Sequence, residues 1–144
     1  MLSFLSLLSS VTLSAAPAAT PCVETERTVA AVRCVEDHWE RAFLTGDAAY
    51  LNVMLSDEFR SYTALGFGHD RAAVVASAQK LAKDLTASAK AAANLPTGDF
   101  QLRGDTATVF WHRADGSLSS VDAFYWANRH WHGWYSQQSS PPAK

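Results

Sequence analysis

The sequence predicts a single α+β domain in which three N-terminal helices pack against a curved antiparallel sheet. Two patterns predict it: apolar residues recur at helical spacing in the first half, and the last third is rich in β-branched and aromatic residues separated by turn signals. Helices followed by consecutive strands are typical of an α+β domain. The chain has 144 residues, enough for one hydrophobic core and too few for two.

The first 19 residues predict a signal peptide, so we expect a periplasmic or secreted protein. This stretch contains no Lys, Arg, Asp or Glu, and its apolar run from Leu2 to Leu13 is too short to span a bilayer. The small residues from Ser14 to Ala19 resemble a cleavage site. Because the usual positive segment is missing, an uncleaved amphipathic or disordered arm is the alternative. We expect no membrane attachment after cleavage.

Export would allow the two cysteines, Cys22 and Cys34, to form a disulfide. A helix running from residue 20 would separate them by about 18 Å, because an α-helix rises ~1.5 Å per residue. A disulfide tolerates Cα separations of only about 7 Å. The bridge therefore requires a helix that begins near Thr25 or Thr28, with the preceding segment folded back. Two free thiols and a bridge between subunits are the alternatives.

Three helices are predicted before residue 83. Apolar positions recur at helical spacing over residues 29–43, and Gly46 ends this long helix. Asp47 is the expected N-cap of a second, shorter helix. After a glycine-rich turn, a third helix is expected to begin near Asp70 and to cover residues 71–82.

The strands are predicted mainly in the last third of the chain. Residues 59–63 are expected to form a short first strand, and the Ala-rich residues 83–94 either prolong the third helix or form an edge strand. The domain is expected to span residues 20–138, followed by an unstructured polar tail over residues 139–144. The later strands, expected as an antiparallel meander, are Phe100–Arg103, Thr106–His112, Val121–Asn128 and Trp131–Gln137.

The composition argues against nucleic-acid binding and for a pocket or an interface. Charged residues are 18% of the chain and the net charge is −2, so the chain lacks the basic surface that neutralises phosphates. Five Trp and seven Phe are more large rings than so small a core requires. Both faces of the later strands carry bulky apolar residues, so we expect a homodimer formed through the sheet.

Two sets of residues stand in an order and spacing that carry a family resemblance. The first set is residues 39–47 with Leu51, Leu55, residues 57–59 and Gly66, and the second is residues 104–109 with residues 121–124, Trp131 and Ser136. Together they resemble nuclear transport factor 2-like (SnoaL-like, ketosteroid-isomerase-like) domains over about residues 29–138. The resemblance implies a cone-shaped fold around a pocket. It does not imply one activity, because the fold hosts isomerases, dehydratases, cyclases, hydrolases and binding modules.

The resemblance also allows one family mechanism to be examined. Ketosteroid isomerase uses a Tyr on its first helix and an Asp on its first strand, and Trp39 and Thr63 occupy those positions here. The indole N–H of a Trp donates a hydrogen bond but does not act as a phenol, and a Thr hydroxyl is no general base at neutral pH. The mechanism is therefore not available in its family form.

Asp122 is the best single candidate for a catalytic residue. It lies within an aromatic strand, where an ionised carboxylate needs a partner, and a position facing the pocket would raise its pKa. The alternative is an ion pair or hydrogen bond with Arg103, Arg113 or a backbone amide at the sheet rim. The large side chains expected to line the pocket beside Asp122, each with core filling as its alternative, are Trp39, Tyr62, Trp111, Tyr125 and Trp126.

No metal site and no cofactor are predicted. The five His residues form no compact ligand motif. A site would require His112 to meet His130 or His132 across the sheet, beside Asp122.

The sequence therefore supports two hypotheses about function. The first is an exported protein that binds an unidentified small apolar molecule in a pocket, with or without weak lyase- or isomerase-type activity. The second is a non-catalytic, dimeric protein-interaction module whose cone is filled by side chains. An open cavity on the order of several hundred Å³, reached by Tyr62 and Asp122, favours the first hypothesis, and a packed cone favours the second.

Overall fold

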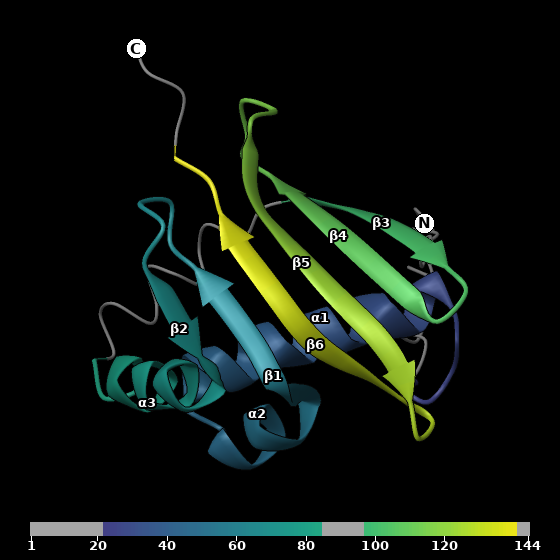
Figure 1. Ribbon diagram of the computed structural model, residues 1–144, viewed down its shortest axis with the longest axis horizontal. Coiled ribbons are helices and arrows are strands. Elements are labelled where there is room, and N and C mark those ends of the chain that lie inside the picture. Colours follow the sequence, from purple (N-terminus) through teal and green to yellow (C-terminus); the bar gives the residue numbers. More distant parts are fainter. Residues whose placement is uncertain (1–21, 85–96, 141–144) are drawn as a thin grey trace, which may run out of the picture.

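The computed structural model describes residues 22–84 and 97–140, which form three helices on one side of a six-stranded sheet (Figure 1). The predicted α+β class is confirmed. The helices are α1 (Val29–Thr45), α2 (Ala48–Met54) and α3 (Arg71–Leu81). The strands are β1 (Leu55–Tyr62), β2 (Gly68–Asp70), β3 (Thr97–Arg103), β4 (Thr106–His112), β5 (Leu118–Ala127) and β6 (His130–Gln138).

Side-chain caps determine where each helix begins. Thr28, Asp47 and Asp70 each accept a hydrogen bond from the backbone N–H three residues later, at 3.1, 3.1 and 2.8 Å. These bonds pair N–H groups that the first turn of a helix leaves free. Gly46 ends α1 with a φ of 71°, a left-handed conformation that favours glycine. The predicted N-cap Asp47, the predicted helix start near Asp70 and the predicted stop at Gly46 are therefore confirmed.

The strands run in the order β2-β1-β6-β5-β4-β3. β3 to β6 form the predicted antiparallel meander. β1 pairs with β6 in parallel, so the sheet is mixed and not purely antiparallel. β2 is a short strand antiparallel to β1, at a place where only a turn was expected. Turn residues define the pairing of consecutive strands, but they carry no information about strands that are far apart in sequence.

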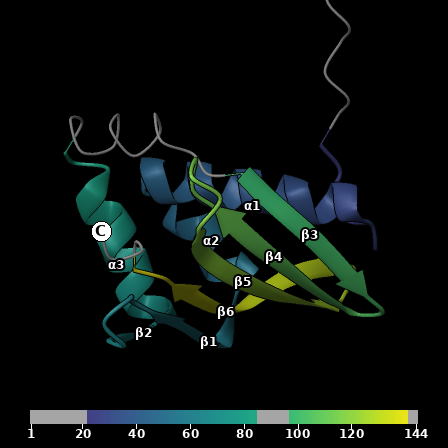
Figure 2. The same ribbon diagram turned by 90° about the horizontal axis from the view of Figure 1, so that it is seen from above.

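The sheet is curved, and α1 lies along its concave side (Figure 2). Register shifts interrupt the pairing of β1 with β6, of β4 with β5 and of β5 with β6. Such bulges bend a strand and increase its twist. We attribute the curvature around the helices to them.

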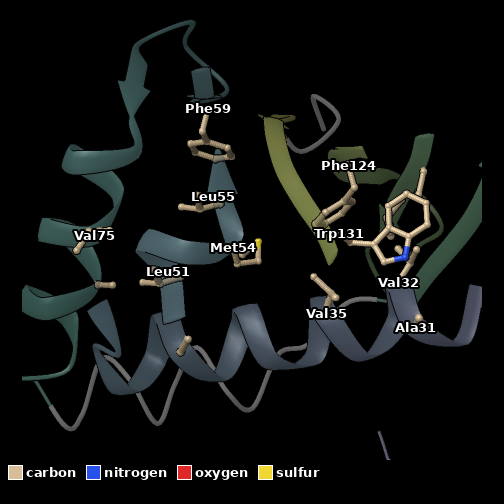
Figure 3. Close-up of a cluster of buried hydrophobic side chains, with 14 residues drawn as sticks. Ala31, Val32, Val35, Leu51, Met54, Leu55, Phe59, Val75, Phe124 and Trp131 are labelled. Carbon is tan, nitrogen blue, oxygen red and sulfur yellow. The ribbon is translucent and has the colours of Figure 1, made fainter. Parts of the chain in front are cut away.

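The hydrophobic core lies between α1 and the inner face of the sheet. Val32 and Val35 of α1 lie opposite Phe124 of β5 and Trp131 of β6, and all four are at most 2% exposed (Figure 3). Complete burial of such a side chain stabilises the fold by about 1.5–3 kcal/mol. Leu51 and Met54 of α2, Leu55 and Phe59 of β1, and Val75 of α3 extend the core toward the other end of α1.

The segment before α1 folds back along the helix. Cys22 and Cys34 are joined by a disulfide, with their Cα atoms 5.5 Å apart. Glu24 lies 2.8 Å from Nδ1 of His38 and accepts a hydrogen bond from the Tyr50 hydroxyl at 3.2 Å. The late start of α1, after Thr28, brings the two cysteines within reach of each other.

Several predicted features lie outside the described residues. These are the signal peptide over residues 1–19, nearly all of the Ala-rich segment and the end of the tail. Ser139 is described, and its N–H donates to the Ser119 carbonyl at 2.8 Å, so backbone pairing extends one residue beyond the predicted domain boundary. Among the helices of residues 22–84 and 97–140, none is both long and apolar enough to cross a membrane.

Candidate functional site

A cavity of about 480 Å³ opens between α1, α3 and the inner face of the sheet. Its position follows from the fold, because α1 packs closely on the sheet at one end while α3 and the strands leave space at the other. The apolar part of the lining includes Trp39, Phe43, Phe59, Val74 and Trp111. The polar part includes Glu36, Glu40, Ser61, Thr63, His69, Ser77, Ser120, Asp122, Ser136 and Gln138.

Glu36 reaches the cavity from the apolar stripe of α1. It lies four residues after Val32 and three before Trp39, so all three side chains share one face of the helix. Glu36 is only 5% exposed. The sequence-based predictions do not include it, although a carboxylate in the middle of an apolar stripe is a signal that points to this position.

Asp122 reaches the cavity from the inner face of β5, where it is 6% exposed. It pairs with Val109 of β4 and with Ser136 of β6, and Phe124 points the same way two residues later. No ion pair to Asp122 is found within the described part of the chain. Arg113, one of the expected partners, donates instead to the carbonyls of Leu118 and Ser139.

Burial raises the pKa of both carboxyl groups. The pKa of Asp122 rises to about 6 because burial disfavours the charged form, while hydrogen bonding from Ser136 and Trp111 opposes the rise. The pKa of Glu36 is raised well above its usual range, first by burial and then by the negative charge of Asp122. Glu40, at the same cavity, has its pKa raised by burial and by Asp37. The surroundings therefore favour the protonated form of both groups, and Asp122 releases its proton near pH 6.

One oxygen of Glu36 has no hydrogen-bond partner. Its Oε1 is fully buried and makes no hydrogen bond within residues 22–84 and 97–140, although hydrogen bonding from the Trp111 side chain acts on the same carboxyl group and opposes the rise in its pKa. An unpaired buried polar group destabilises a protein by about 1–3 kcal/mol. The site therefore holds a polar atom that a bound molecule can satisfy.

Three of the predicted pocket residues line the cavity, namely Trp39, Trp111 and Asp122. Their neighbours hold the two rings in place. Trp39 meets Phe59 and Phe124 edge to face, with ring centroids 5.9 and 5.8 Å apart. Trp111 meets Phe100 of β3 in the same way at 5.7 Å.

Two of the predicted pocket residues, Tyr62 and Tyr125, do not line the cavity and need correction. Ser61 and Thr63 of the β1 segment line it, and side chains alternate along an extended chain, so Tyr62 between them points outward, where its ring lies 5.9 Å from that of Tyr135. Tyr125 also points outward, because it is the next residue along β5 after Phe124, whose side chain is buried on the inner face. The parity of each strand, which the sequence did not reveal, decides both positions.

The remaining two expectations about side chains concern Trp126 and the histidines. Trp126 packs against Trp131 with ring centroids 5.3 Å apart, which is its core-filling alternative. His132 stacks on the outward Tyr125 at 5.4 Å, whereas Asp122 points inward, so the sheet separates the two groups that a metal site would have required. Among the described residues, no group of three or more metal-ligating side chains lies close enough to hold an ion.

The positions compared with ketosteroid isomerase both border the cavity. Trp39 and Thr63 line it, and the Thr63 hydroxyl accepts a hydrogen bond from the Phe67 N–H at 3.2 Å. Neither provides a general base. The buried ionisable groups that border this cavity are Glu36 and Asp122.

Comparison with known proteins identifies the fold and no closer relationship. No protein-family model matches the chain, and no curated protein matches it. A solved NTF2-like protein of unknown function from Silicibacter pomeroyi is similar in structure, with a TM-score of 0.59 at 14% identity; the match covers 76% of this chain and 92% of that one.

Two further solved structures are similar over comparable lengths. An NTF2-like protein with a cystatin-like fold from Novosphingobium aromaticivorans has a TM-score of 0.57 at 18% identity, covering 78% of this chain and 81% of that one. A putative Ca/calmodulin-dependent kinase II association domain from Exiguobacterium sibiricum has a TM-score of 0.58 at 14% identity, covering 78% and 92%. Identities this low support a shared fold and do not transfer a function. The chain therefore has the nuclear transport factor 2-like fold, in agreement with the resemblance of its sequence.

Proposed function

We propose that this protein binds a small, largely apolar molecule inside the cone. The observation that carries the proposal is the open cavity of about 480 Å³, whose lining combines large rings with buried polar groups. Ligand sites in proteins typically have this size and this mixture of apolar walls and few polar groups. A cone filled by side chains, which the interaction-module hypothesis requires, does not agree with a cavity of this volume.

A matched pair of variants tests this proposal. Ser120 lines the cavity, whereas Thr108, between the buried Ala107 and Val109, points to the opposite face of the sheet. The neutral probe 1-naphthylmethanol should bind the wild-type protein and Thr108→Phe in ligand-observed NMR. Ser120→Phe should weaken binding by about tenfold or more, since the new ring occupies the cavity. Equal binding to both variants would overturn the proposal, and so would a wild-type protein that binds neither this probe nor its amine and acid analogues.

We also propose a secondary, weak lyase- or isomerase-type activity. What supports it is a carboxyl group with a pKa of about 6 on one wall and, on α1, a second carboxyl group whose pKa is raised by burial. General acid–base catalysis typically uses a base whose pKa lies near the working pH together with an acid. Exchange of the α-protons of 2-tetralone for deuterium, followed by NMR, tests it: Asp122→Asn should abolish any exchange above background. Exchange that persists in this variant contradicts the proposal.

Export to the periplasm or to the outside of the cell is the third part of the proposal. A disulfide within the chain is supported by an oxidising compartment and is rare in reducing ones. Expression in a Gram-negative bacterium followed by fractionation and N-terminal sequencing tests it. The expected result is a periplasmic protein that begins near Thr20, and an intact N-terminus in the cytoplasm would refute it.

We propose, finally, a homodimer formed through the outer face of the sheet. What supports it is a row of outward rings: Trp134 is 45% exposed and lies 5.7 Å from Tyr135, which in turn neighbours Tyr62. In sedimentation at tens of micromolar, the wild-type protein should be a dimer and Trp134→Lys a monomer. Phe67→Lys alters an exposed ring in the β1–β2 loop and should leave the dimer intact. A monomeric wild-type protein would end this proposal.

A further inference from the structure

The ionisable side chains that line the cavity are mainly acidic. Glu36, Glu40 and Asp122 are carboxylic acids, and among the described lining residues the exposed His69 is the one basic side chain, with no Lys or Arg. An anionic ligand would meet repulsion there and no Lys or Arg partner among the described lining residues. The cavity therefore favours a neutral or a positively charged molecule.

Glu36 and Asp122 border the same space from different elements. One belongs to α1 and the other to β5, and the charge of Asp122 acts on Glu36 directly. Asp37 and Glu40 of α1 add further negative charge near Glu36, and the Tyr50 hydroxyl of α2 feels the charge of Glu36. Within the described residues, no Lys or Arg is among the groups that influence Glu36. Two buried carboxyl groups thus share a site without a cation.

The unpaired Oε1 of Glu36 is a second, independent observation. It belongs to a side chain that lines the cavity, and it makes no hydrogen bond within the described chain, while the Trp111 side chain acts on the same carboxyl group. A carboxylate oxygen is an acceptor, and a charged N–H group is the donor that pairs with it most strongly. An ammonium group would satisfy this oxygen and neutralise the neighbouring charge at the same time.

The aromatic walls suit the rest of such a molecule. Trp39, Phe59 and Trp111 border the cavity together with the acids. Aromatic faces attract a cation through their ring electrons, Trp most strongly, and they also accept an apolar body.

We propose that the cavity takes an amine: its ammonium group lies between Glu36 and Asp122, and its apolar or aromatic body lies beside Trp39 and Trp111. This inference rests on the proposed function, since it names the chemical class of the molecule bound in the cone. An ammonium group in this position also occupies the two groups that would move protons. The amine is therefore bound and not turned over.

The affinity for an amine is expected to depend on pH in a distinctive way. Its ammonium group pairs with ionised carboxylates, so binding releases protons from the protein and the affinity rises with pH while the two acids titrate. A neutral carbonyl ligand would instead accept a hydrogen bond from a protonated Glu36, and its affinity would fall as pH rises. The sign of the pH dependence separates the two classes of ligand.

Three probes with one ring system test the inference: 1-naphthylmethylamine, 1-naphthylmethanol and 1-naphthoic acid. In calorimetry at about pH 7.5, the amine should bind about tenfold or more tightly than the alcohol, and the acid should bind most weakly. The affinity for the amine should drop about fivefold or more at about pH 5.5.

The variant Glu36→Gln should remove the preference for the amine, so that amine and alcohol bind within about threefold of each other. Glu58→Gln, which alters an exposed carboxylate outside the cavity lining, should keep the preference. If Glu36→Gln does not fold, Asp122→Asn and the pH dependence of the wild-type protein carry the same test.

The outcomes separate this inference from the proposed function. Equal binding of amine and alcohol, or an affinity for the amine that falls as pH rises, overturns the inference while the pocket proposal stands. Retention of the preference in Glu36→Gln also overturns it. Failure of all three probes to bind overturns both.

Discussion

The indole N–H of Trp131 donates a hydrogen bond to the backbone carbonyl of Glu26 at 2.8 Å, across 105 residues of sequence. The bond joins the segment before α1 to the last strand. Trp131 is 2% exposed, so the bond lies at the edge of the core, where water competes poorly. Together with the disulfide, it ties the N-terminal segment to the domain.

Replacement of Trp131 by Phe tests this connection. The variant loses the donor, part of the buried ring and the partner of the Glu26 carbonyl, so we expect a loss of about 2–4 kcal/mol in the free energy of unfolding. Urea denaturation measures it. Phe67→Leu, at an exposed ring of the β1–β2 loop, is the control and should change stability by about 0.5 kcal/mol or less. Equal losses in both variants would contradict the role given to Trp131.

Reduction of the disulfide should destabilise the protein. Cys22 and Cys34 are 12 residues apart, and closing a loop of about this length in the unfolded chain contributes about 3 kcal/mol. We expect a lower Tm in the presence of a reducing agent. A variant with both cysteines replaced by Ser should show the lower Tm with and without the agent. A wild-type Tm that does not change on reduction would refute the prediction.

Stability should fall as pH rises through the titration of Asp122. The folded protein holds this proton until a pKa of about 6, whereas the unfolded chain releases it near the ordinary value of 3.8. A group whose pKa is raised on folding stabilises the folded state fully at pH values below its unfolded-state pKa. This stabilisation is lost as pH rises through its folded-state pKa. The loss is roughly 3 kcal/mol, at ~1.4 kcal/mol for each pKa unit. The raised pKa of Glu36 adds a loss of the same sign.

Urea denaturation at a series of pH values measures this effect. The Asn side chain of Asp122→Asn does not titrate, so the variant lacks this loss. Its free energy of unfolding should therefore rise relative to that of the wild type as pH rises from about 4 to about 6. A constant difference over this range would show that the Asp122 pKa is not raised in the folded protein.

The substitution Gly98→Ala should disturb the cavity through Trp111. A Cβ at this position of β3 would lie 2.8 Å from the Phe100 ring and 2.9 Å from the Trp111 ring, which is too close. We expect overpacking to reduce stability by about 1–3 kcal/mol. The Trp111 ring should shift, and the binding of 1-naphthylmethanol should weaken. Gly104→Ala, in an open turn with φ of 59°, is a control that strains the backbone without touching the cavity, so its binding should be unchanged.

The sequence by itself determined the local structure. Thr28, Asp47 and Asp70 cap their helices, and Gly46 stops α1, because capping depends on residues three or four positions apart. The antiparallel pairing of β3 to β6 follows from the turns between consecutive strands. Asp122 could be selected because a carboxylate inside an aromatic strand stands out in the sequence.

Only the tertiary structure decided what the site contains. Strand register decides that Tyr62 and Tyr125 point outward. Contacts between distant parts of the chain pair β1 with β6 in parallel and bring Glu36 and Asp122 to the same cavity. A shift of one residue in a strand would exchange its inner and outer side chains. Register depends on pairing between distant parts of the chain, so neither periodicity nor composition could reveal which carboxylates share the cavity.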